Sequence, residues 1–308
     1  MRDFKFFACR DSVLLGEKIA MLLGKRLAKL HVSNFADGDL RVWVEGDVKG
    51  KNCVVLQTTR IDPNNRLMEL CLTISALKLA GAKLIMAVVP CLGYSRQHRV
   101  FQKGETNAAL LVARFLETAG ANRVCFVVLH NEVILKFFRI PAFNLKTDNL
   151  FLEKIKNLKL KDFVILAPDF GSAGQVEWLS RKLKAPLVKI KKRRKIKGFG
   201  KEDWCEALGI MGKVSGKDAV IVDDEISSGG TVAAAVKMLG QHKAGKIYVF
   251  ATHPVFGRKT YENLSALPIK KIFVTDTIPL GKEAKKSLPN LEVISIANLL
   301  AEAIKKHI

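Results

Sequence analysis

Three acidic residues stand directly before a turn of small and hydroxyl-bearing residues in the stretch AVIVDDEISSGGTVAAAV, residues 219–236. Glycine lets backbone N–H groups approach an anion closely, and serine and threonine hydroxyls supply further donors. A helix that begins at the turn adds a favourable dipole and N–H groups that lack helical partners. The turn is therefore predicted to hold a phosphate group through the residues Ser227, Ser228, Gly229, Gly230 and Thr231.

The acids Asp223 and Asp224 are offset from this turn along the chain, at the end of an apolar run. Carboxylates at that offset can accept hydrogen bonds from sugar hydroxyls or help to hold Mg²⁺. An acidic strand end followed by a turn of small residues is the alternative, and it is the commoner meaning of such a short pattern taken alone. Neither G-K-[ST] nor G-x-G-x-x-G is present, which disfavours ordinary P-loop and dinucleotide sites.

Two further stretches carry groups suited to a nucleotide. In GYSRQHR, residues 93–99, Arg96 and Arg99 can pair with phosphates or stack on a base, and Gln97 can bind a base edge. In NFADGD, residues 34–39, an adenine could stack on Phe35 while Asp37 or Asp39 accepts from its amino group. The alternatives are two surface arginines and an ordinary Asp-Gly turn.

Single polar residues also follow two apolar runs. His130 follows VCFVVL and Asp169 follows FVILAP. A neutral imidazole and a carboxylate can share one Mg²⁺, although this ion prefers oxygen ligands. A structural role for each residue is the alternative.

The run KIKKRRKIK, residues 189–197, is almost entirely basic. A loop that closes over a polyphosphate, with Gly198 and Gly200 as hinges, is one interpretation. A solvated basic face or a nucleic-acid patch is the other. The nucleic-acid interpretation lacks interleaved aromatic residues for base stacking.

Apolar, β-branched runs of four to six residues recur along the chain, as is typical of strands that are buried on both faces. They occupy residues 53–57, 84–89, 124–129, 163–167, 219–223, 247–252 and 271–275. Segments with helical periodicity lie between them at residues 66–82, 106–121 (with Thr106 as the expected N-cap), 171–185 and 230–245. This alternation predicts an α/β fold of two doubly wound domains with mainly parallel sheets.

The composition limits the function classes. The chain has 308 residues, 49% of them hydrophobic, so a substantial core is expected. The excess of 51 Lys and Arg over 29 Asp and Glu favours an anionic partner without saying which one. The scattered cysteines are expected to be buried, reduced thiols. A chain without a signal peptide or a transmembrane run is expected to be cytoplasmic.

The stretch VIVDDEISSGGT resembles the phosphoribosyl-diphosphate-binding loop of the type I phosphoribosyltransferases. Further segments in the same order resemble one family of that fold, the ribose-phosphate pyrophosphokinases. These segments cover nearly the whole chain: residues 34–59, 65–99, 115–124, 129–138, 167–174, 182–194 and 252–257. A break near residues 141–150 predicts domains at 1–143 and 144–296, and the last helix, 297–308, is expected to pack back on the first domain.

The resemblance also implies a reaction and its residues. The diphosphoryl group of Mg-ATP would pass to the 1-hydroxyl of ribose 5-phosphate, giving 5-phosphoribosyl 1-diphosphate and AMP. The implied roles are catalysis by Lys192 and Arg194; ATP binding by Phe35, Asp37, Asp39, Arg96, Gln97 and Arg99; ribose 5-phosphate binding by Asp223, Asp224 and 227–231; and Mg²⁺ binding by His130 and Asp169. A homo-oligomer, dimer or hexamer, is implied, with the 34–39 loop reaching a neighbouring subunit; neither nucleic acid nor membrane is an expected partner.

The chain departs from the family pattern at four positions. His98 and Ser227 stand where an acid is usual or frequent, Phe170 where a histidine is usual, and Glu225 where an apolar residue is usual. These departures make a catalytically weak regulatory paralogue one alternative function. A phosphoribosyltransferase, which uses the same loop, is another. The GYSRQHR segment and the full-length match argue against a phosphoribosyltransferase, which needs no ATP site.

Overall fold

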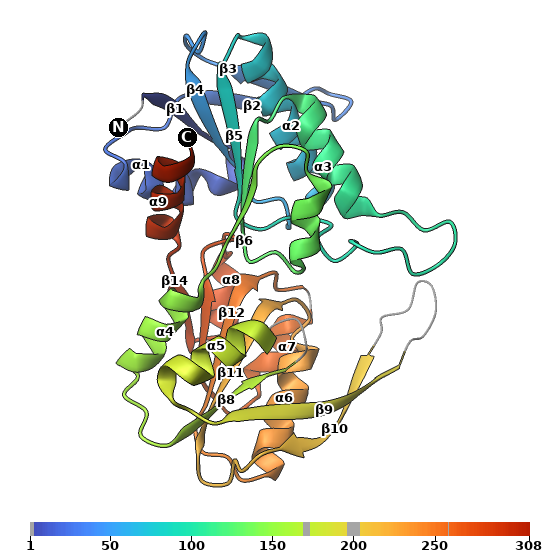
Figure 1. Cartoon of the computed structure of the whole chain (residues 1–308), viewed down its shortest axis with the longest axis vertical. Helices are drawn as coiled ribbons and strands as arrows, with labels where there is room; N and C mark the ends of the chain where they lie inside the picture. The colour runs from blue at the N-terminus through green and yellow to red at the C-terminus, as the bar shows by residue number, and fades with distance from the viewer. Residues whose placement is uncertain (1–2, 169–172, 196–203, 258) are drawn as a thin grey trace. The chain divides into compact units, whose positions relative to one another are not determined.

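The computed structural model describes residues 3–168, 173–195, 204–257 and 259–308, and for residues 173, 191–195 and 204–208 it describes only the backbone. The chain divides into two compact units (Figure 1). Unit 1 comprises residues 1–146, 277–279 and 295–308, and unit 2 comprises residues 147–276 and 280–294.

Unit 1 contains a parallel five-stranded sheet with the order β1-β4-β5-β6-β7. Its strands are β1 (Phe4–Ala8), β4 (Asn52–Leu56), β5 (Leu84–Val89), β6 (Arg123–Val127) and β7 (Ala142–Leu145). Its helices are α1 (Val13–Leu22), α2 (Pro63–Leu79), α3 (Ala108–Ala119) and α9 (Ala297–His307), with 3₁₀ turns η1 (Arg10–Ser12) and η2 (Glu132–Phe137).

Helices cover both faces of this sheet. Alternate strand residues such as Val55 and Ala87 pack in one core with α2 and α3. The helices α1 and α9 contact each other, and Figure 1 shows them on the side of the sheet away from α3. The arrangement explains why the central strands read as continuous apolar runs, because each face is buried beneath a helix layer.

The end of α9 is bonded to the sheet of unit 1. The Arg123 guanidinium of β6 donates to the carbonyl of His307, and the His307 ring stacks on Phe143 of β7 with ring centres 3.8 Å apart. Leu300 and Ile304 on the same helix are fully buried. The last helix of the chain is thus part of the first unit.

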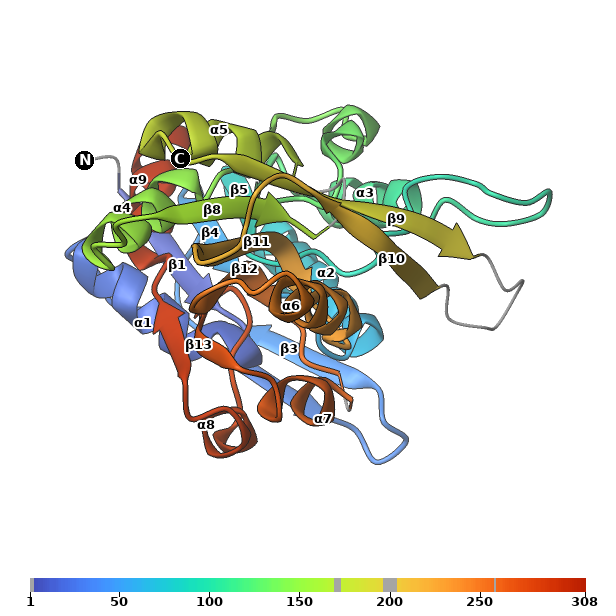
Figure 2. The same cartoon turned by 90° about the horizontal axis from the view of Figure 1, so that it is seen from below.

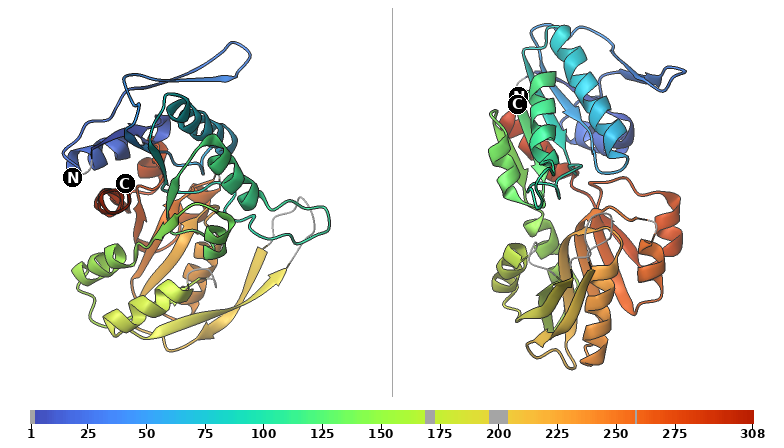
Figure 3. Two further views of the ribbon diagram at one scale, coloured as in Figure 1. Left: turned by 45° about the horizontal axis from the view of Figure 1, so that its top comes forward. Right: turned by 90° about the vertical axis from the view of Figure 1, so that its right-hand side faces the viewer.

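A separate antiparallel hairpin is formed by β2 (Leu30–Asn34) and β3 (Leu40–Val44). Figure 3 shows it projecting away from the five-stranded sheet of unit 1. The loop at its tip, residues 35–39, contains the aromatic and acidic residues expected to bind adenine.

Unit 2 contains a seven-stranded sheet with the order β10-β9-β8-β11-β12-β13-β14, in which only β10 is antiparallel. The strands are β8 (Phe163–Ala167), β9 (Leu187–Lys195), β10 (Trp204–Met211), β11 (Asp218–Ile226), β12 (Ile247–Pro254), β13 (Ile269–Thr275) and β14 (Leu291–Ile294). The helices are α4 (Asp148–Asn157), α5 (Ala173–Leu183), α6 (Gly230–Gln241), α7 (Thr260–Ser265) and α8 (Lys282–Ser287).

Two cores lie on opposite faces of this sheet. Ile221 belongs to the core shared with α6 and α7, whereas Val220 and Val222 belong to the core shared with α4 and α5. Figure 2 shows these two helix layers above and below the strands. The expected α/β fold with two mainly parallel, helix-covered sheets is therefore confirmed.

Two local expectations differ from the structure. Helix α3 is capped by Asn107, whose Oδ1 accepts from the amide of Leu110 at 3.0 Å, and not by Thr106. Residues 189–195 of the basic run lie in strand β9, paired with β10, whereas a loop was one interpretation of this run; residues 196–200, with the expected hinges Gly198 and Gly200, lie outside the described residues. Pairing with β10 holds the backbone of these residues in a strand, whatever the charge of their side chains.

The described thiols Cys9, Cys53, Cys71, Cys91 and Cys125 are not joined in disulfides. All but Cys71 are buried, and burial raises the pKa of Cys125 to about 12. Among the described residues, every helix is too short or too polar to span a bilayer.

Candidate functional site

Strand β11 extends beyond its neighbour β8. Its pairing with β8 ends at Ile221, opposite Leu166, whereas its pairing with β12 continues to Ile226, opposite Pro254. The acids Asp223 and Asp224 lie in the part that has passed β8, and they are 3% and 7% exposed. The carboxyl end of a parallel sheet, where neighbouring strands diverge, is where open α/β folds bind ligands.

The two carboxylates are held by the amides that follow them. Asp223 Oδ1 accepts from the amide of Asp224 at 3.0 Å, and Asp224 Oδ1 accepts from the amide of Glu225 at 2.9 Å. A carboxylate has about four acceptor sites, so a single amide does not saturate it. Such fixed acceptors suit the hydroxyls of a sugar.

The turn after β11 requires glycine at one position. Gly229 has φ 79° and ψ −4°, and it is the N-cap of α6. A Cβ atom at this position would lie 3.1 Å from Cγ of Leu264. The first amides of α6 have no acceptor within the helix and point out of its N-terminus, so the turn can bind an anion.

The carbonyl oxygens of this turn are bound on the side of α7. The Ser227 carbonyl accepts from the amide of Gly257 at 2.9 Å and from the hydroxyl of Thr260. The Ser228 carbonyl accepts from Nδ2 of Asn263 at 2.8 Å. Because the C=O and N–H of a trans peptide point in opposite directions, the N–H groups of Ser228 and Gly229 face away from α7. They are therefore directed to the side where an anion could bind.

In unit 1, the turn after β5 is packed tightly against the end of β4. The Gly93 amide donates to Oγ1 of Thr59 at 2.9 Å, and a Cβ at Gly93 would lie only 2.4 Å from the Thr59 carbonyl oxygen. Tyr94 follows with φ 62°, a left-handed conformation that bends the chain sharply. This close contact fixes where the next residues emerge.

The predicted ATP-binding residues of this turn lie at the surface. Arg96, Gln97 and Arg99 are exposed, while the backbone of Gln97 is bonded to Tyr94 and to Ala109 at the start of α3. Exposed side chains on a fixed backbone are suited to a ligand that approaches from solvent. Their predicted contact with ATP stays a prediction.

Two histidines meet at the carboxyl edge of the same sheet. The rings of His98, after β5, and His130, after β6, have centres 6.0 Å apart and planes tilted by 56°. Burial lowers the pKa of His98 most; its contact with the Ser95 carbonyl opposes this shift, and the charges of His130 and Arg99 add to it. The neutral imidazole is therefore favoured at His98.

The tip of the β2–β3 hairpin is ordered by its own contacts. The Phe35 amide donates to the Asp39 carbonyl at 2.8 Å, and Asp37 Oδ1 accepts from the Asp39 amide at 3.2 Å. Phe35 is 53% exposed, with the Arg41 guanidinium 5.9 Å from its ring centre. An exposed ring and two exposed carboxylates at a projecting tip could contact a base held by another chain.

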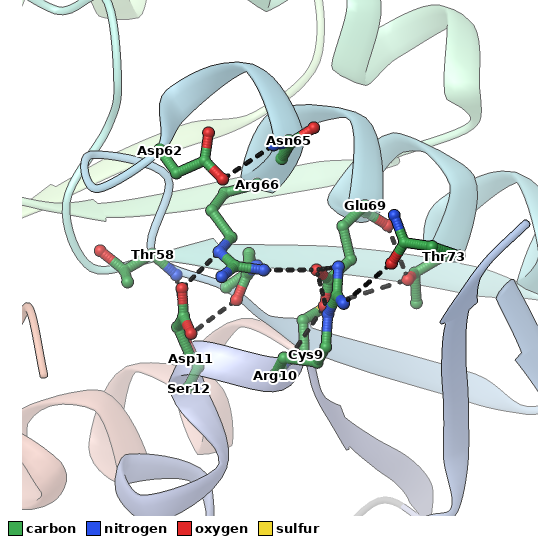
Figure 4. A network of polar contacts seen from close by, with 12 residues as sticks. Cys9, Arg10, Asp11, Ser12, Thr58, Asp62, Asn65, Arg66, Glu69 and Thr73 are labelled. Atoms are coloured by element: carbon green, nitrogen blue, oxygen red, sulfur yellow. Dashed lines mark hydrogen bonds and ion pairs between the residues drawn. The ribbon is translucent and has the colours of Figure 1, made fainter. Parts of the chain in front are cut away.

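A buried ionic network, which sequence analysis missed, joins η1 to α2 (Figure 4). The Glu69 side chain of α2 is fully buried, with Nη2 of Arg10 and Nη1 of Arg66 each 3.0 Å from Oε2. Arg66 also pairs with Asp11. Arg10 Nη1 lies 3.4 Å from Oδ1 of Asn34, so the network connects α2 to the base of the hairpin tip.

The remaining predicted residues are described in part or not at all. Lys192 and Arg194 lie in β9 opposite Ala207 and Cys205 of β10, and only their backbone is described. Asp169 lies outside the described residues. No group of three or more His, Cys, Asp or Glu side chains that could hold a metal ion occurs among the side chains that are described.

Two family models match the chain. The model described as the N-terminal domain of ribose phosphate pyrophosphokinase matches residues 4–120. The model described as the phosphoribosyl synthetase-associated domain matches residues 182–308. The two matches include both the GYSRQHR turn and the β11–α6 turn.

Curated proteins and one solved structure are similar over nearly the full length. A ribose-phosphate pyrophosphokinase of Bacillus caldolyticus is 36% identical, covering 99% of this chain and 94% of the relative. One from Caldanaerobacter subterraneus is 38% identical over 98% of this chain and 94% of its own. The structure of phosphoribosylpyrophosphate synthetase from Mycobacterium smegmatis matches with a TM-score of 0.89 and 32% identity, covering 99% of this chain and 98% of that one.

Proposed function

We infer that this chain, which belongs to the ribose-phosphate pyrophosphokinase family, is a ribose-phosphate diphosphokinase. It transfers the diphosphoryl group of ATP to the 1-hydroxyl of ribose 5-phosphate, giving 5-phosphoribosyl 1-diphosphate and AMP. The cytoplasmic location expected from the sequence forms part of this proposal.

The turn at the N-terminus of α6 is the observation that carries the assignment of the ribose 5-phosphate site. Residues 227–231 would bind the 5-phosphate through backbone amides and hydroxyls, with the helix dipole favouring the anion. The carbonyls of Ser227 and Ser228 are bound on the opposite side, which supports this orientation. A phosphate can therefore approach without meeting those carbonyl oxygens.

The ribose ring would lie beside the acids of β11. Asp223 and Asp224 would accept hydrogen bonds from the 2- and 3-hydroxyls, since each carboxylate is held by a neighbouring amide. Two fixed acceptors on the sugar and an anion cradle on the phosphate define one orientation of the substrate. That orientation is what a transfer to the 1-hydroxyl needs.

ATP would bind to Arg96, Gln97 and Arg99, with the arginines contacting phosphates or stacking on the base and Gln97 reading the base edge. A neighbouring subunit would contribute Phe35, Asp37 and Asp39 from its hairpin tip. The exposed aromatic ring of the projecting hairpin supports this arrangement. The proposal therefore includes a homo-oligomer, a dimer or hexamer, in which the hairpin completes the adenine site of another chain.

Lys192 and Arg194 would stabilise the charge on the transferring diphosphoryl group. His130 and Asp169 would hold the Mg²⁺ of Mg-ATP, and a bound Mg²⁺ would neutralise phosphate oxygens. Imidazole is an unusual ligand for this ion, so phosphate and carboxylate oxygens would supply most of its coordination. The roles of all four residues rest on the family resemblance.

The test of the reaction is direct. Purified protein, Mg-ATP and ribose 5-phosphate are mixed, and AMP is separated from ATP by chromatography. We expect AMP in amounts equal to the 5-phosphoribosyl 1-diphosphate formed, and no AMP without ribose 5-phosphate. No AMP above the protein-free control, with Mg²⁺ or other divalent ions, would instead favour the regulatory paralogue.

The catalytic assignment is tested within strand β9. Lys192→Ala is expected to lower kcat by about 10²–10³-fold, the usual effect of losing one group that stabilises transition-state charge. Lys189→Ala is the matched control, because Lys189 lies in the same strand and its side chain is 67% exposed near Glu177. Equal activity of the two variants would contradict the role of Lys192.

A further inference from the structure

Two imidazoles of unit 1, those of His98 and His130, come from turns that follow adjacent strands. His98 follows β5 and His130 follows β6, and these strands pair in parallel, so both rings lie at the carboxyl edge of the sheet. Their centres are 6.0 Å apart. Both side chains are half-buried, which leaves each partly accessible to a ligand.

The ring of His98 is oriented by the backbone around it. Its Nδ1 lies 3.2 Å from the Ser95 carbonyl, and its own carbonyl accepts from Nδ2 of Asn107 at 3.2 Å. The same Asn107 caps α3, which ties the position of His98 to a helix end. A histidine that donates Nδ1–H to a carbonyl keeps the lone pair on Nε2, as metal-binding histidines commonly do.

The spacing of the rings fits one shared ion. Imidazole nitrogens bind transition metals at about 2.0–2.1 Å, which places each ring centre roughly 3.2 Å from the ion. Two ring centres are then about 5.2 Å apart at a tetrahedral angle and at most about 6.4 Å apart when the nitrogens lie opposite each other. The observed 6.0 Å lies within this limit. Two protein nitrogens would leave the other coordination positions to water or phosphate oxygens.

We propose that His98 and His130 form a two-imidazole site for a divalent transition-metal ion such as Co²⁺ or Zn²⁺. Imidazole suits these ions, whose affinity for nitrogen ligands rises along the first transition series, whereas Mg²⁺ prefers oxygen. The pair would bind a transition-metal ion in preference to Mg²⁺ beside the proposed ATP site, more strongly than a single histidine could. The proposal rests on the proposed function only for the nearness of ATP, because the two rings can bind an ion in the free protein.

The surrounding charge affects the affinity. Arg96 and Arg99 flank His98 in sequence and are exposed, so they oppose a cation at the pair. Phosphate groups bound to those arginines would offset their charge and supply oxygen ligands. Binding of the ion is therefore expected to be tighter when a nucleotide is present.

The experiment uses the full chain without a polyhistidine tag, stripped of metal with a chelator. CoCl₂ is titrated in, and binding is followed by the visible absorption of protein-bound Co²⁺. We expect His98→Gln and His130→Gln each to weaken Co²⁺ binding at least about tenfold. Addition of Mg²⁺ in about hundredfold excess is expected to displace little Co²⁺ from the wild-type protein.

The matched control is His242→Gln, because His242 is an exposed histidine at the end of α6 in unit 2. This variant is expected to bind Co²⁺ like the wild type. Circular dichroism and thermal unfolding without metal show whether each variant is folded, and Co²⁺ affinities are compared only between folded proteins. A second substitution, His98→Asn, is used if His98→Gln does not fold.

Two results would overturn the proposal: no Co²⁺ binding by the wild type, with or without a non-hydrolysable ATP analogue, or unchanged binding in the folded His98 variants. Either result would leave AMP formation with Mg-ATP untouched, so it would not count against the proposed function. Conversely, absence of AMP formation would not affect Co²⁺ binding to the free protein. The two proposals therefore fail separately.

Discussion

At the scale of single residues, Glu69 shows how a fully buried charge is made tolerable in this fold. Its Oε1 accepts from the Arg10 amide at 2.9 Å, and its Oε2 faces the guanidinium groups of Arg10 and Arg66. Removing the carboxylate leaves both guanidinium groups without their shared anion, although the side chains of Arg10 and Arg66 are 38% and 18% exposed. Loss of the Glu69 carboxylate is therefore expected to destabilise the protein by more than the intact ion pairs stabilise it.

We predict that Glu69→Gln lowers the free energy of unfolding by about 3 kcal/mol, because two guanidinium groups lose their shared anion. Urea unfolding measures the change. Glu45→Gln is the control, since Glu45 pairs with Lys29 and His31 at the surface, where such pairs contribute about 0–1 kcal/mol. Equal losses of unfolding free energy in the two variants would show that the burial of Glu69 does not increase its contribution to stability.

The same network predicts an effect beyond stability. Arg10 reaches Asn34, and Nδ2 of Asn34 donates to the Gly38 carbonyl at 3.0 Å within the hairpin tip. If that tip binds adenine, a folded Glu69→Gln protein should show a raised KM for ATP and an unchanged KM for ribose 5-phosphate. Equal changes in both KM values would contradict a local effect.

Gly229 is the residue of the ribose-phosphate turn at which the addition of a Cβ atom is expected to disturb the turn most. We predict that Gly229→Ala raises the KM for ribose 5-phosphate at least about tenfold, because a Cβ would strain the positive φ and press on Leu264. Gly240→Ala is the matched control in the same helix, since nothing lies within 4 Å of a Cβ there. Steady-state kinetics would contradict the prediction if both variants behaved alike.

Among single residues, the sequence predicts those that act together with neighbours along the chain. The turn 227–231 could be found because its glycines and hydroxyls are adjacent. Glu69 could not, because its partner Arg10 is far away in the sequence and an acid in a helix usually faces water. Its position between apolar neighbours in MELC was the only signal.

At the scale of elements, the edge strand β14 depends on ionic contacts that the central strands do not need. Glu292 of β14 accepts from Lys154 of α4, and its Oε2 accepts from Lys271 of β13 at 2.8 Å. The bond with Lys154, and then that with Lys271, lowers the pKa of Glu292 below its ordinary value of 4.5. One carboxylate thus links three elements at the edge of unit 2.

A depressed carboxyl pKa adds stability above the unfolded value and loses it as the pH falls through the folded value. We predict that Glu292→Gln destabilises the protein by about 1 kcal/mol at pH 7, since the group is partly exposed, and that the difference from wild type shrinks below pH 4.5. Chemical denaturation at pH 7 and at about pH 3 measures both values. A difference that persists at the lower pH would contradict the prediction.

The control for this series is Glu153→Gln on the exposed face of α4. It is expected to change the free energy of unfolding by at most about 0.5 kcal/mol at either pH. Lys154, the next residue, is unchanged in this variant. A pH-dependent loss in both variants would point to a general charge effect and not to the contacts of β14.

Elements were predictable where burial controls their sequence. The central strands β4, β5, β8 and β11 to β13 read as apolar runs because helices cover both of their faces. The strands β9 and β10, by contrast, carry basic or mixed residues, and the sequence of β9 was equally consistent with a loop. Backbone hydrogen bonds between strands do not depend on side-chain polarity. A strand pair at the edge of a sheet, such as β9 and β10, therefore need not contain an apolar run.

At the scale of the whole molecule, the chain leaves unit 1, builds unit 2 and returns to place α9 in unit 1. The returning helix buries Leu300 and Ile304 completely. The stability of unit 1 therefore depends on a segment made last, about 150 residues after the rest of its core. Sequence periodicity reveals the helix itself but not which of two similar cores receives it.

We predict that Leu300→Ala lowers the stability of unit 1 by about 2–5 kcal/mol, the usual effect of removing a buried leucine side chain. Hydrogen exchange measured by mass spectrometry should show lost protection in β1, β4 and β5, which are distant in sequence from the substitution. Protection of β11 and β12 should change less, because they belong to the other unit.

Leu111→Ala is the matched control, because Leu111 lies on α3 of the same unit and is 46% exposed. Its effect on exchange should be small, since a half-exposed side chain loses little burial. Equal loss of protection in both units after Leu300→Ala would mean that the two units unfold as one cooperative body. Loss confined to α9 would mean that the helix detaches while the sheet of unit 1 stays folded, and the last helix would then be an attachment to that core and not a part of it.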